Sequence, residues 1–199
     1  MARTRNEALH VKRKAQITRA ARKCFIAKGI HSSSMQDICK TSKISPGALY
    51  RYYPSKQAII EAIAAEEHQQ NTDLVEYIRA QPSALEALCE AVPDILDQLL
   101  QKDFARLMIE ISTEATRNEA VRSAFSTVED QFKSDLTQIF KDAKAEGSIR
   151  SEIDIESSIF LFLTLLDGIT SRAAGGQTPP RKAIAKSLIN AIKALFPSN

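Results

Sequence analysis

The stretch of the chain from residue 42 to residue 56 concentrates side chains that can bind phosphates and base edges. Its sequence, SKISPGALYRYYPSK, holds Tyr50, Tyr52 and Tyr53, with Arg51 between two of them. Tyrosine hydroxyls can donate hydrogen bonds to phosphate oxygens, and arginine can pair bidentately with guanine. We therefore expect this stretch to bind a nucleic acid.

Short helices must position these side chains. Ser45 and Pro46 predict a helix start, because serine is a favoured N-cap and proline a favoured first helical residue. Ser34, with Asp37 three residues later, predicts a capped two-turn helix just before it. Together with an amphipathic helix that stops at Gly29, this pattern is typical of a helix-turn-helix DNA-binding unit.

The charge of the chain is distributed unevenly. The net charge of all 199 residues is only +3, yet residues 1–60 carry 13 Lys/Arg against 2 Asp/Glu. The remaining residues carry 14 basic and 22 acidic side chains. A basic head on an acidic body indicates that the first segment binds a polyanion. The head itself is expected to open with a flexible basic arm over residues 1–10.

The rest of the chain predicts an all-α body. Hydrophobic residues make up 44% of the sequence, and the 6 glycines and 7 prolines lie mostly between helical periods. We expect a DNA-binding domain over 1–55, arm included, and a body over 56–199, linked by a long helix over 56–79. Further helices are expected at 83–101, 103–116, 119–146, 155–174 and 181–196. The helix at 155–174 is apolar nearly all round, which favours burial on several sides and a second subunit on the last.

Other classes of function have little support. The 3 histidines are not paired with nucleophiles or metal-spaced carboxylates, the 3 cysteines lack metal-type spacing, and no Gly-rich phosphate loop is present. We expect no catalysis, no cofactor and no metal. The longest apolar run is far shorter than the roughly 20 residues that span a bilayer, and the basic, polar start does not read as a signal peptide. The protein is expected in the cytoplasm.

Residues 13–60 resemble the DNA-binding domain of the TetR family of bacterial regulators. The resemblance rests on the AA-x-x-x-F pattern before Gly29, the Asp37-Ile38 pair and the Ser45-x-Gly47-x-Leu49-Tyr50-x-x-Tyr53-x-x-Lys56 pattern. It implies an all-α homodimer with a three-helix head and a six-helix body. It also implies repression by operator binding, with release when a small molecule enters the body.

The expected DNA contacts fall into two groups. The side chains that would bind phosphates are Ser34, Ser45, Tyr50, Tyr52 and Lys56, and those that would face bases are Pro46, Gly47, Ala48 and Arg51. Lys43 stands where the family usually has glycine. A left-handed lysine there costs roughly 1–2 kcal/mol, so the turn differs slightly or Lys43 supplies a further phosphate contact. Tyr53 is expected in the core.

The resemblance also implies where the chain dimerises and binds its effector. Dimerisation is expected on the last two helices, through Phe160, Leu163, Ile169, Ala173, Ile184, Leu188, Ile192 and Leu195. The effector pocket is expected to involve Phe104, Met108, Glu110, Glu114, Phe132, Phe162 and Asp167. Carboxylates among aromatic side chains suit a lipophilic cation, as for an efflux regulator, although a Phe or Met stripe is also typical of core. The alternative function is a constitutive architectural DNA-binding protein that responds to no ligand.

Overall fold

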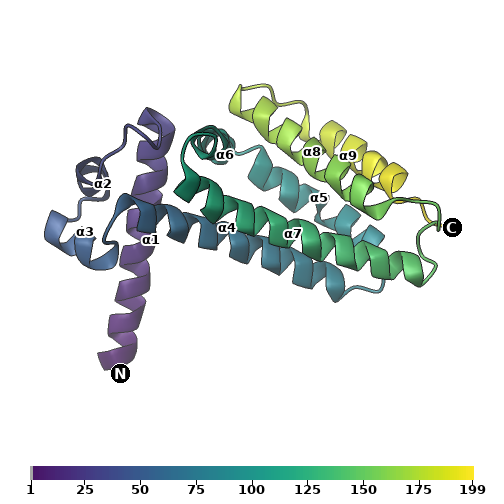
Figure 1. Ribbon diagram of the computed structural model, residues 1–199, viewed down its shortest axis with the longest axis horizontal. Helices are drawn as coiled ribbons and strands as arrows, with labels where there is room; N and C mark the ends of the chain where they lie inside the picture. The colour runs from purple at the N-terminus through teal and green to yellow at the C-terminus, as the bar shows by residue number, and fades with distance from the viewer. Residues whose placement is uncertain (1) are drawn as a thin grey trace. The chain divides into compact units, whose positions relative to one another are not determined.

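The computed structural model describes the backbone of residues 2–199 and the side chains of residues 7–199, and it is all helical with short connections (Figure 1). This confirms the all-α fold class. The helices of the described residues are α1 Ala2–Lys28, α2 Met35–Ser42, α3 Pro46–Tyr52, α4 Lys56–Arg79, α5 Ala84–Leu99, α6 Lys102–Ala115, α7 Glu119–Ala145, α8 Ile155–Ala174 and α9 Arg181–Leu195.

The helix boundaries agree closely with the sequence pattern everywhere except at the start. The expected flexible arm is instead the first part of α1, which begins at Ala2. Residues 2–28 contain neither glycine nor proline and are rich in Ala, Arg and Lys, which favour helix. No helix in the part of the chain that is described has the length and apolar character to cross a membrane.

The described chain packs as two compact units. The first unit comprises Met1–Glu66 with Leu107–Ser126, and the second comprises Glu67–Arg106 with Thr127–Asn199. Helices α4, α6 and α7 each contribute residues to both units. Compact packing does not establish independent folding, so the expected division between residues 55 and 56 stays a prediction.

The core of the first unit holds α1, α2 and α3 together. Phe25 of α1, Ile38 of α2, Leu49 of α3 and Ile59 of α4 are each at most 1% exposed and belong to one apolar cluster. In Figure 1, α2 and α3 lie beside one part of α1, and the N-terminal turns of α1 extend past them. The apolar face of α1 therefore fixes the two shorter helices.

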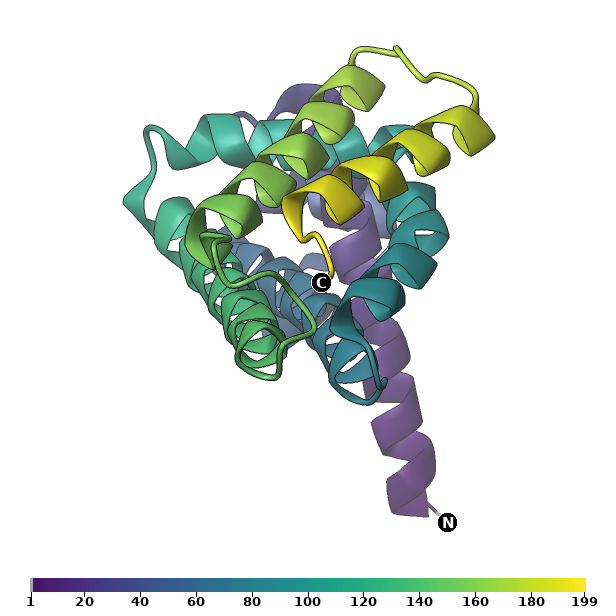
Figure 2. The ribbon, with the colours of Figure 1, turned by 90° about the vertical axis from the view of Figure 1, so that its right-hand side faces the viewer.

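The second unit is a bundle with its own core. Leu88 and Val92 of α5, Phe140 of α7 and Ile192 of α9 are fully buried in one cluster. Helices α8 and α9 run side by side (Figure 2), and α5 packs against both of them. A long helix such as α8, apolar on most sides, is stabilised in this setting because several neighbours cover it.

Candidate nucleic-acid interface

The helix-turn-helix begins at a complete N-terminal cap. Ser34 Oγ accepts a hydrogen bond from the backbone N–H of Asp37 at 3.2 Å, and the Asp37 carboxylate accepts one from the backbone N–H of Ser34 at 3.0 Å. The Ser34 hydroxyl donates its proton to the same carboxylate at 2.7 Å, and Lys28 donates to the other oxygen at 2.6 Å. Lys28 first, and Ser34 after it, hold the pKa of Asp37 well below its usual range. The expected cap is present, and it uses the proton that Ser34 would donate to a phosphate.

Lys43 lies in the left-handed conformation in the turn between α2 and α3. Its φ is 56° and its ψ 34°, and it is the one non-glycine residue with a positive φ in the described backbone. The carbonyl of Cys39 accepts the cap hydrogen bond, and the carbonyl of Ser42 accepts one from Gln16 Nε2 at 2.6 Å. The turn is therefore pinned to α1, and the exposed Lys43 side chain projects from it.

Helix α3 presents its polar and small residues to solvent. Its inner side consists of Leu49, at 0% exposure, and Tyr53, at 6%. The predicted N-cap Ser45 is in place but makes no side-chain cap hydrogen bond, so its hydroxyl is available. Tyr50 is 51% exposed. The outward residues of the helix and its cap, Ser45, Pro46, Gly47, Tyr50 and Arg51, are exposed together, and Ala48 is half-buried beside them.

Tyr52 is held by the N-terminal part of α1. The His10 ring lies 5.0 Å from the Tyr52 ring, centroid to centroid, and the Arg51 guanidinium lies 5.7 Å from the same ring. Lys14 Nζ lies 5.6 Å from the ring of Tyr53, whose pKa is raised, chiefly by burial. Reasoning from the sequence did not select His10 or Lys14, because only the packing of α1 against α3 brings these distant residues together.

Lys56 has a different role from the expected phosphate contact. Its Nζ donates to the backbone carbonyls of Ile30 at 2.6 Å, His31 at 3.2 Å and Ser33 at 2.9 Å. An ammonium group has three donors, and each of them here has a carbonyl acceptor. Lys56 therefore fastens the α1–α2 turn, and its ammonium group has no donor left for a phosphate.

Two carboxylates expected in the effector pocket lie in the first unit. Glu110 Oε1 accepts a hydrogen bond from the backbone N–H of Ile30 at 2.8 Å. Glu114 is only 2% exposed and accepts hydrogen bonds from Arg117 at 2.7 Å and Asn118 at 3.3 Å. Met108 packs against the core of the same unit. Both carboxylates therefore have hydrogen-bond partners within the first unit.

The other expected pocket residues belong to the second unit. Phe162 is 1% exposed in the core, and Phe132 packs against that core. Both residues therefore contribute to the apolar core of the second unit. Phe104 is half-buried. Burial raises the pKa of Asp167, and burial together with the negative charge of Asp167 raises the pKa of Glu129 on α7. Glu129 lies 38 residues away from Asp167 in the chain, so no local pattern in the sequence pairs the two.

The expected dimer surface needs a correction. Ala173, Leu188 and Ile192 are at most 3% exposed, and Leu188 and Ile192 belong to the core of the second unit, so none of the three lies on its outer surface. Leu163, Ile169, Ile184 and Leu195 are half-buried against the same core. Phe160, by contrast, is 61% exposed. Leu161 and Leu165, which the sequence analysis did not select, are exposed beside it.

Comparison with known proteins assigns this arrangement to a family. Residues 17–63, which include the helix-turn-helix, match the family of bacterial regulatory proteins described as the tetR family. Residues 83–197 match the C-terminal domain of the BetI-type transcriptional repressors, and this match alone covers more than half of the chain. The chain belongs to the TetR family.

Individual relatives agree along most of the chain. The structure of Salmonella enterica GusR is 30% identical, with a TM-score of 0.77 over 93% of this chain and 95% of that one. The transcriptional regulator UidR of Escherichia coli (strain K12) is 29% identical over 160 residues, which is 78% of this chain and 79% of UidR. The fatty acid degradation regulator FadR from Bacillus halodurans shares the fold, with a TM-score of 0.80 over 94% of this chain and 97% of that one, at 18% identity.

Membership in the TetR family settles the general function. The chain is a DNA-binding transcriptional repressor of the TetR family and not an enzyme. TetR regulators bind DNA operators and small-molecule effectors. In this chain the exposed side of α3 and the Lys43 turn present hydroxyl, guanidinium and ammonium groups to solvent.

Proposed function

We propose that two copies of this chain bind a palindromic operator through their helix-turn-helix units, and that a small molecule bound by the second unit releases them. The exposed side of α3 carries the proposal. It brings the free Ser45 hydroxyl, Tyr50 and Arg51 to one surface over a fully buried Leu49. In this arrangement the hydroxyls position the helix on phosphates, and Arg51 reads a guanine in the major groove.

Lys43 and Tyr52 extend this surface. Lys43 adds a cation at the turn, where its left-handed backbone points the side chain outward. Tyr52, oriented by His10 and Arg51, supplies a further hydroxyl for a phosphate. A homodimer repeats the surface about a two-fold axis, which matches the symmetry of a palindromic site.

A titration of the purified full-length protein against the DNA upstream of its own gene tests operator binding. The same DNA with its sequence scrambled is the control, and both are measured over a range of salt concentrations. We expect tight binding to the natural sequence alone, with a steep loss of affinity as salt rises. Equal weak binding to both duplexes would favour the alternative, a constitutive architectural DNA-binding protein.

For the effector we propose a lipophilic cation, as expected of a regulator of efflux. The support is the pair formed by Asp167 and Glu129, two solvent-exposed carboxylates that lie near enough for the negative charge of Asp167 to raise the pKa of Glu129, so that their mutual repulsion has a cost. A cation placed between them would relieve this cost, and the apolar residues of α8 would contact its hydrophobic groups. Helices α4, α6 and α7 contribute to both units, so a ligand that favours one arrangement of these helices can alter DNA binding.

Calorimetric titration with tetraphenylphosphonium, and with triphenylphosphine oxide as a neutral relative, tests the effector. We expect heat of binding for the cation alone, its loss in Asp167→Asn, and release of operator DNA by the cation. Glu152→Gln, which changes an exposed carboxylate before α8, is the matched control. Equal binding of both compounds would exclude a cation-specific site.

A further inference from the structure

Helix α1 is longer than the core of the first unit requires. It begins at Ala2, whereas its buried apolar residues begin only at Ile17. The side chains of residues 7–15 are all exposed. In Figure 1 these turns continue past α3 instead of ending beside it. The N-terminal turns of α1 therefore form a surface of their own, next to the helix that is proposed to enter the major groove.

One stripe of α1 changes from apolar to basic where it leaves the core. His10, Lys14 and Ile17 lie within about 60° of one another around the helix axis, because they are spaced by four and three residues. Ile17 is fully buried. Outside the core, the His10 ring lies 5.0 Å from the Tyr52 ring, and Lys14 Nζ lies 5.6 Å from the centre of the Tyr53 ring. The basic part of the stripe therefore adjoins the C-terminal end of α3.

The charge of this segment is complementary to that of DNA. Residues 1–36 contain nine Lys/Arg and one acidic residue, Glu7. Tyr52 is a phosphate contact of the proposed operator complex, and His10 is its neighbour. A DNA strand that Tyr52 binds therefore passes beside the basic stripe of α1. This makes the stripe continuous with the side of α3 that would face the operator.

The helical form of these residues limits how they can contact DNA. A helix with its side chains is about 10–12 Å in diameter, whereas the minor groove of B-DNA is about 6 Å wide. The N-terminal turns of α1 are thus too thick to enter the minor groove as an extended arm would. Residues 2–10 span about 12 Å, which is the length of three to four base pairs. They are long enough to follow the phosphate backbone beyond the base pairs that α3 contacts.

We propose that the N-terminal turns of α1 bind the DNA backbone beside the base pairs that α3 contacts, with His10 and Lys14 as phosphate contacts. This inference rests on the proposed operator binding and extends the bound DNA at both ends. The Lys14 ammonium neutralises a phosphate, and a ring N–H of His10 donates to a phosphate oxygen. Such contacts recognise no bases, so the flanks add affinity whatever their sequence. In the homodimer the contact occurs once on each flank.

Operator duplexes of different length test this inference. A long duplex with the operator at its centre is shortened from both ends in single base-pair steps, and the affinity of the full-length protein is measured by fluorescence anisotropy. Single base-pair changes first identify the positions that α3 recognises. We expect wild-type affinity to fall while the flanks are being removed, before any recognised base pair is lost. Replacing the flanks of the long duplex by a different sequence should leave the affinity unchanged.

Variants of α1 assign the effect to individual side chains. Lys14→Gln should lower the salt slope by about 1 on the long duplex and leave it unchanged on a duplex without flanks. Lys12→Gln is the matched control, because Lys12 is an exposed lysine on the opposite side of the same helix, and it should keep the wild-type slope. His10→Phe keeps an aromatic ring beside Tyr52 but removes the N–H groups, so it should weaken binding to the long duplex alone, by about tenfold.

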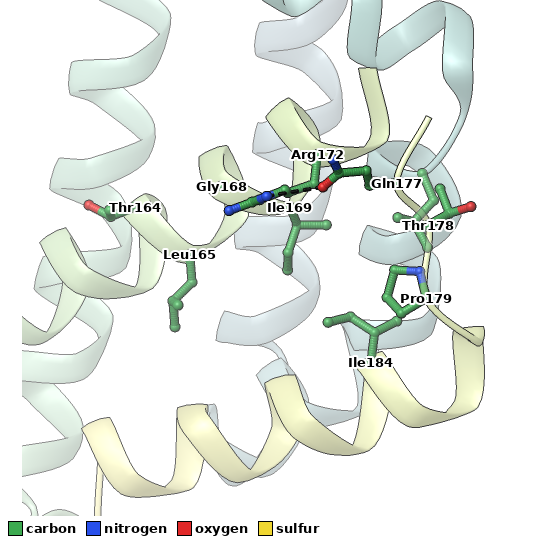
Figure 3. A pocket seen from close by; sticks show the side chains of 10 residues that line it. Thr164, Leu165, Gly168, Ile169, Arg172, Gln177, Thr178, Pro179 and Ile184 are labelled. Atoms are coloured by element: carbon green, nitrogen blue, oxygen red, sulfur yellow. Dashed lines mark hydrogen bonds between the residues drawn. The ribbon is translucent and has the colours of Figure 1, made fainter. Parts of the chain in front are cut away.

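The same variants should leave the second unit unchanged. His10, Lys12 and Lys14 all belong to the first unit, whereas the second unit contains α8, α9 and the open cavity of about 610 Å³ between them (Figure 3). Thermal unfolding and light scattering of each variant should therefore match wild type. A loss of DNA affinity in these variants then reports a lost contact with the flanks and not a loss of fold.

The outcomes separate this inference from operator binding. Wild-type affinity that stays constant until recognised base pairs are removed would overturn the flanking contact and leave operator binding standing. Equal losses in Lys12→Gln and Lys14→Gln would overturn it as well, because general charge and not the stripe would then bind the DNA. His10→Phe with wild-type affinity on every duplex would exclude His10 as a contact. A wild-type protein that binds the operator no better than scrambled DNA at any length would overturn operator binding itself.

Discussion

Glu110 on α6 accepts a hydrogen bond from the backbone N–H of Ile30, in the turn between α1 and α2, at 2.8 Å. Lys56 on α4 donates to three carbonyls of the same turn. Two oppositely charged side chains from two different helices therefore hold the turn that precedes the DNA-binding helices. Gly29 makes this approach possible: its φ is 83°, and a Cβ there would lie 2.9 Å from Glu110 Oε1.

Removal of the Glu110 carboxylate should destabilise the first unit. We expect Glu110→Ala to lower the free energy of unfolding by about 1–3 kcal/mol, because the N–H of Ile30 loses its partner in a half-buried place. Glu110→Gln, which keeps an acceptor oxygen, should cost less. Urea unfolding measures both, with Ser112→Ala on the exposed side of α6 as the control. Equal stability of the alanine and wild-type proteins would show that water replaces the carboxylate.

Lys43 should separate stability from DNA binding. Lys43→Gly relieves a left-handed lysine, which costs roughly 1–2 kcal/mol, so we expect the variant to unfold at a higher temperature. The same change removes a proposed phosphate contact, so operator affinity should fall and the salt slope should decrease by about 1. Lys40→Gln, at an exposed position on α2, controls for loss of one charge from the head. A variant that is more stable and binds DNA unchanged would remove Lys43 from the interface.

Variants of Tyr50 and Arg51 should distinguish a phosphate contact, which positions the protein on any DNA, from a base contact, which recognises the operator sequence. Tyr50→Phe removes one hydroxyl from an exposed ring and should weaken binding to all DNA sequences alike, without change in stability. Arg51→Ala should cost about 1–3 kcal/mol on the operator and relax specificity at one base pair. Binding to a set of operators with single base-pair changes measures both effects. Tyr77→Phe, on a tyrosine in the second unit, is the matched control.

Asp37 should make the stability of the first unit depend on pH in the acidic range. Its folded pKa is lowered, chiefly by Lys28, so the stabilisation is fully present above the ordinary carboxyl pKa. Stability should decline as the pH falls below that ordinary value toward the folded pKa, because protonation breaks the bonds to Lys28 and Ser34. Thermal unfolding of wild type and Asp37→Asn over acidic pH measures this. The variant should show the weaker pH dependence, and parallel curves would contradict the assignment.

The chain sequence by itself determined the helices and the nature of the head. Caps such as Ser34 with Asp37, and starts such as Ser45 with Pro46, act between residues a few positions apart, so they can be recognised locally. The basic charge of the first 60 residues and the motif of the TetR family pointed to DNA for the same reason: both are written in consecutive residues.

Only the tertiary structure decided which partners the charged side chains take and which side of α8 stays open. Lys56 and Glu110 find backbone partners 26 and 80 residues away, and no local pattern encodes such distances. Helix α8 has apolar residues on nearly every side, so its sequence does not show which of them are exposed. Packing against α5 and α9 buries Ile159, Phe162 and Ala173 and leaves Phe160, Leu161 and Leu165 at the surface. The neighbouring helices determine which residues of α8 are buried, because burial depends on the assembled core.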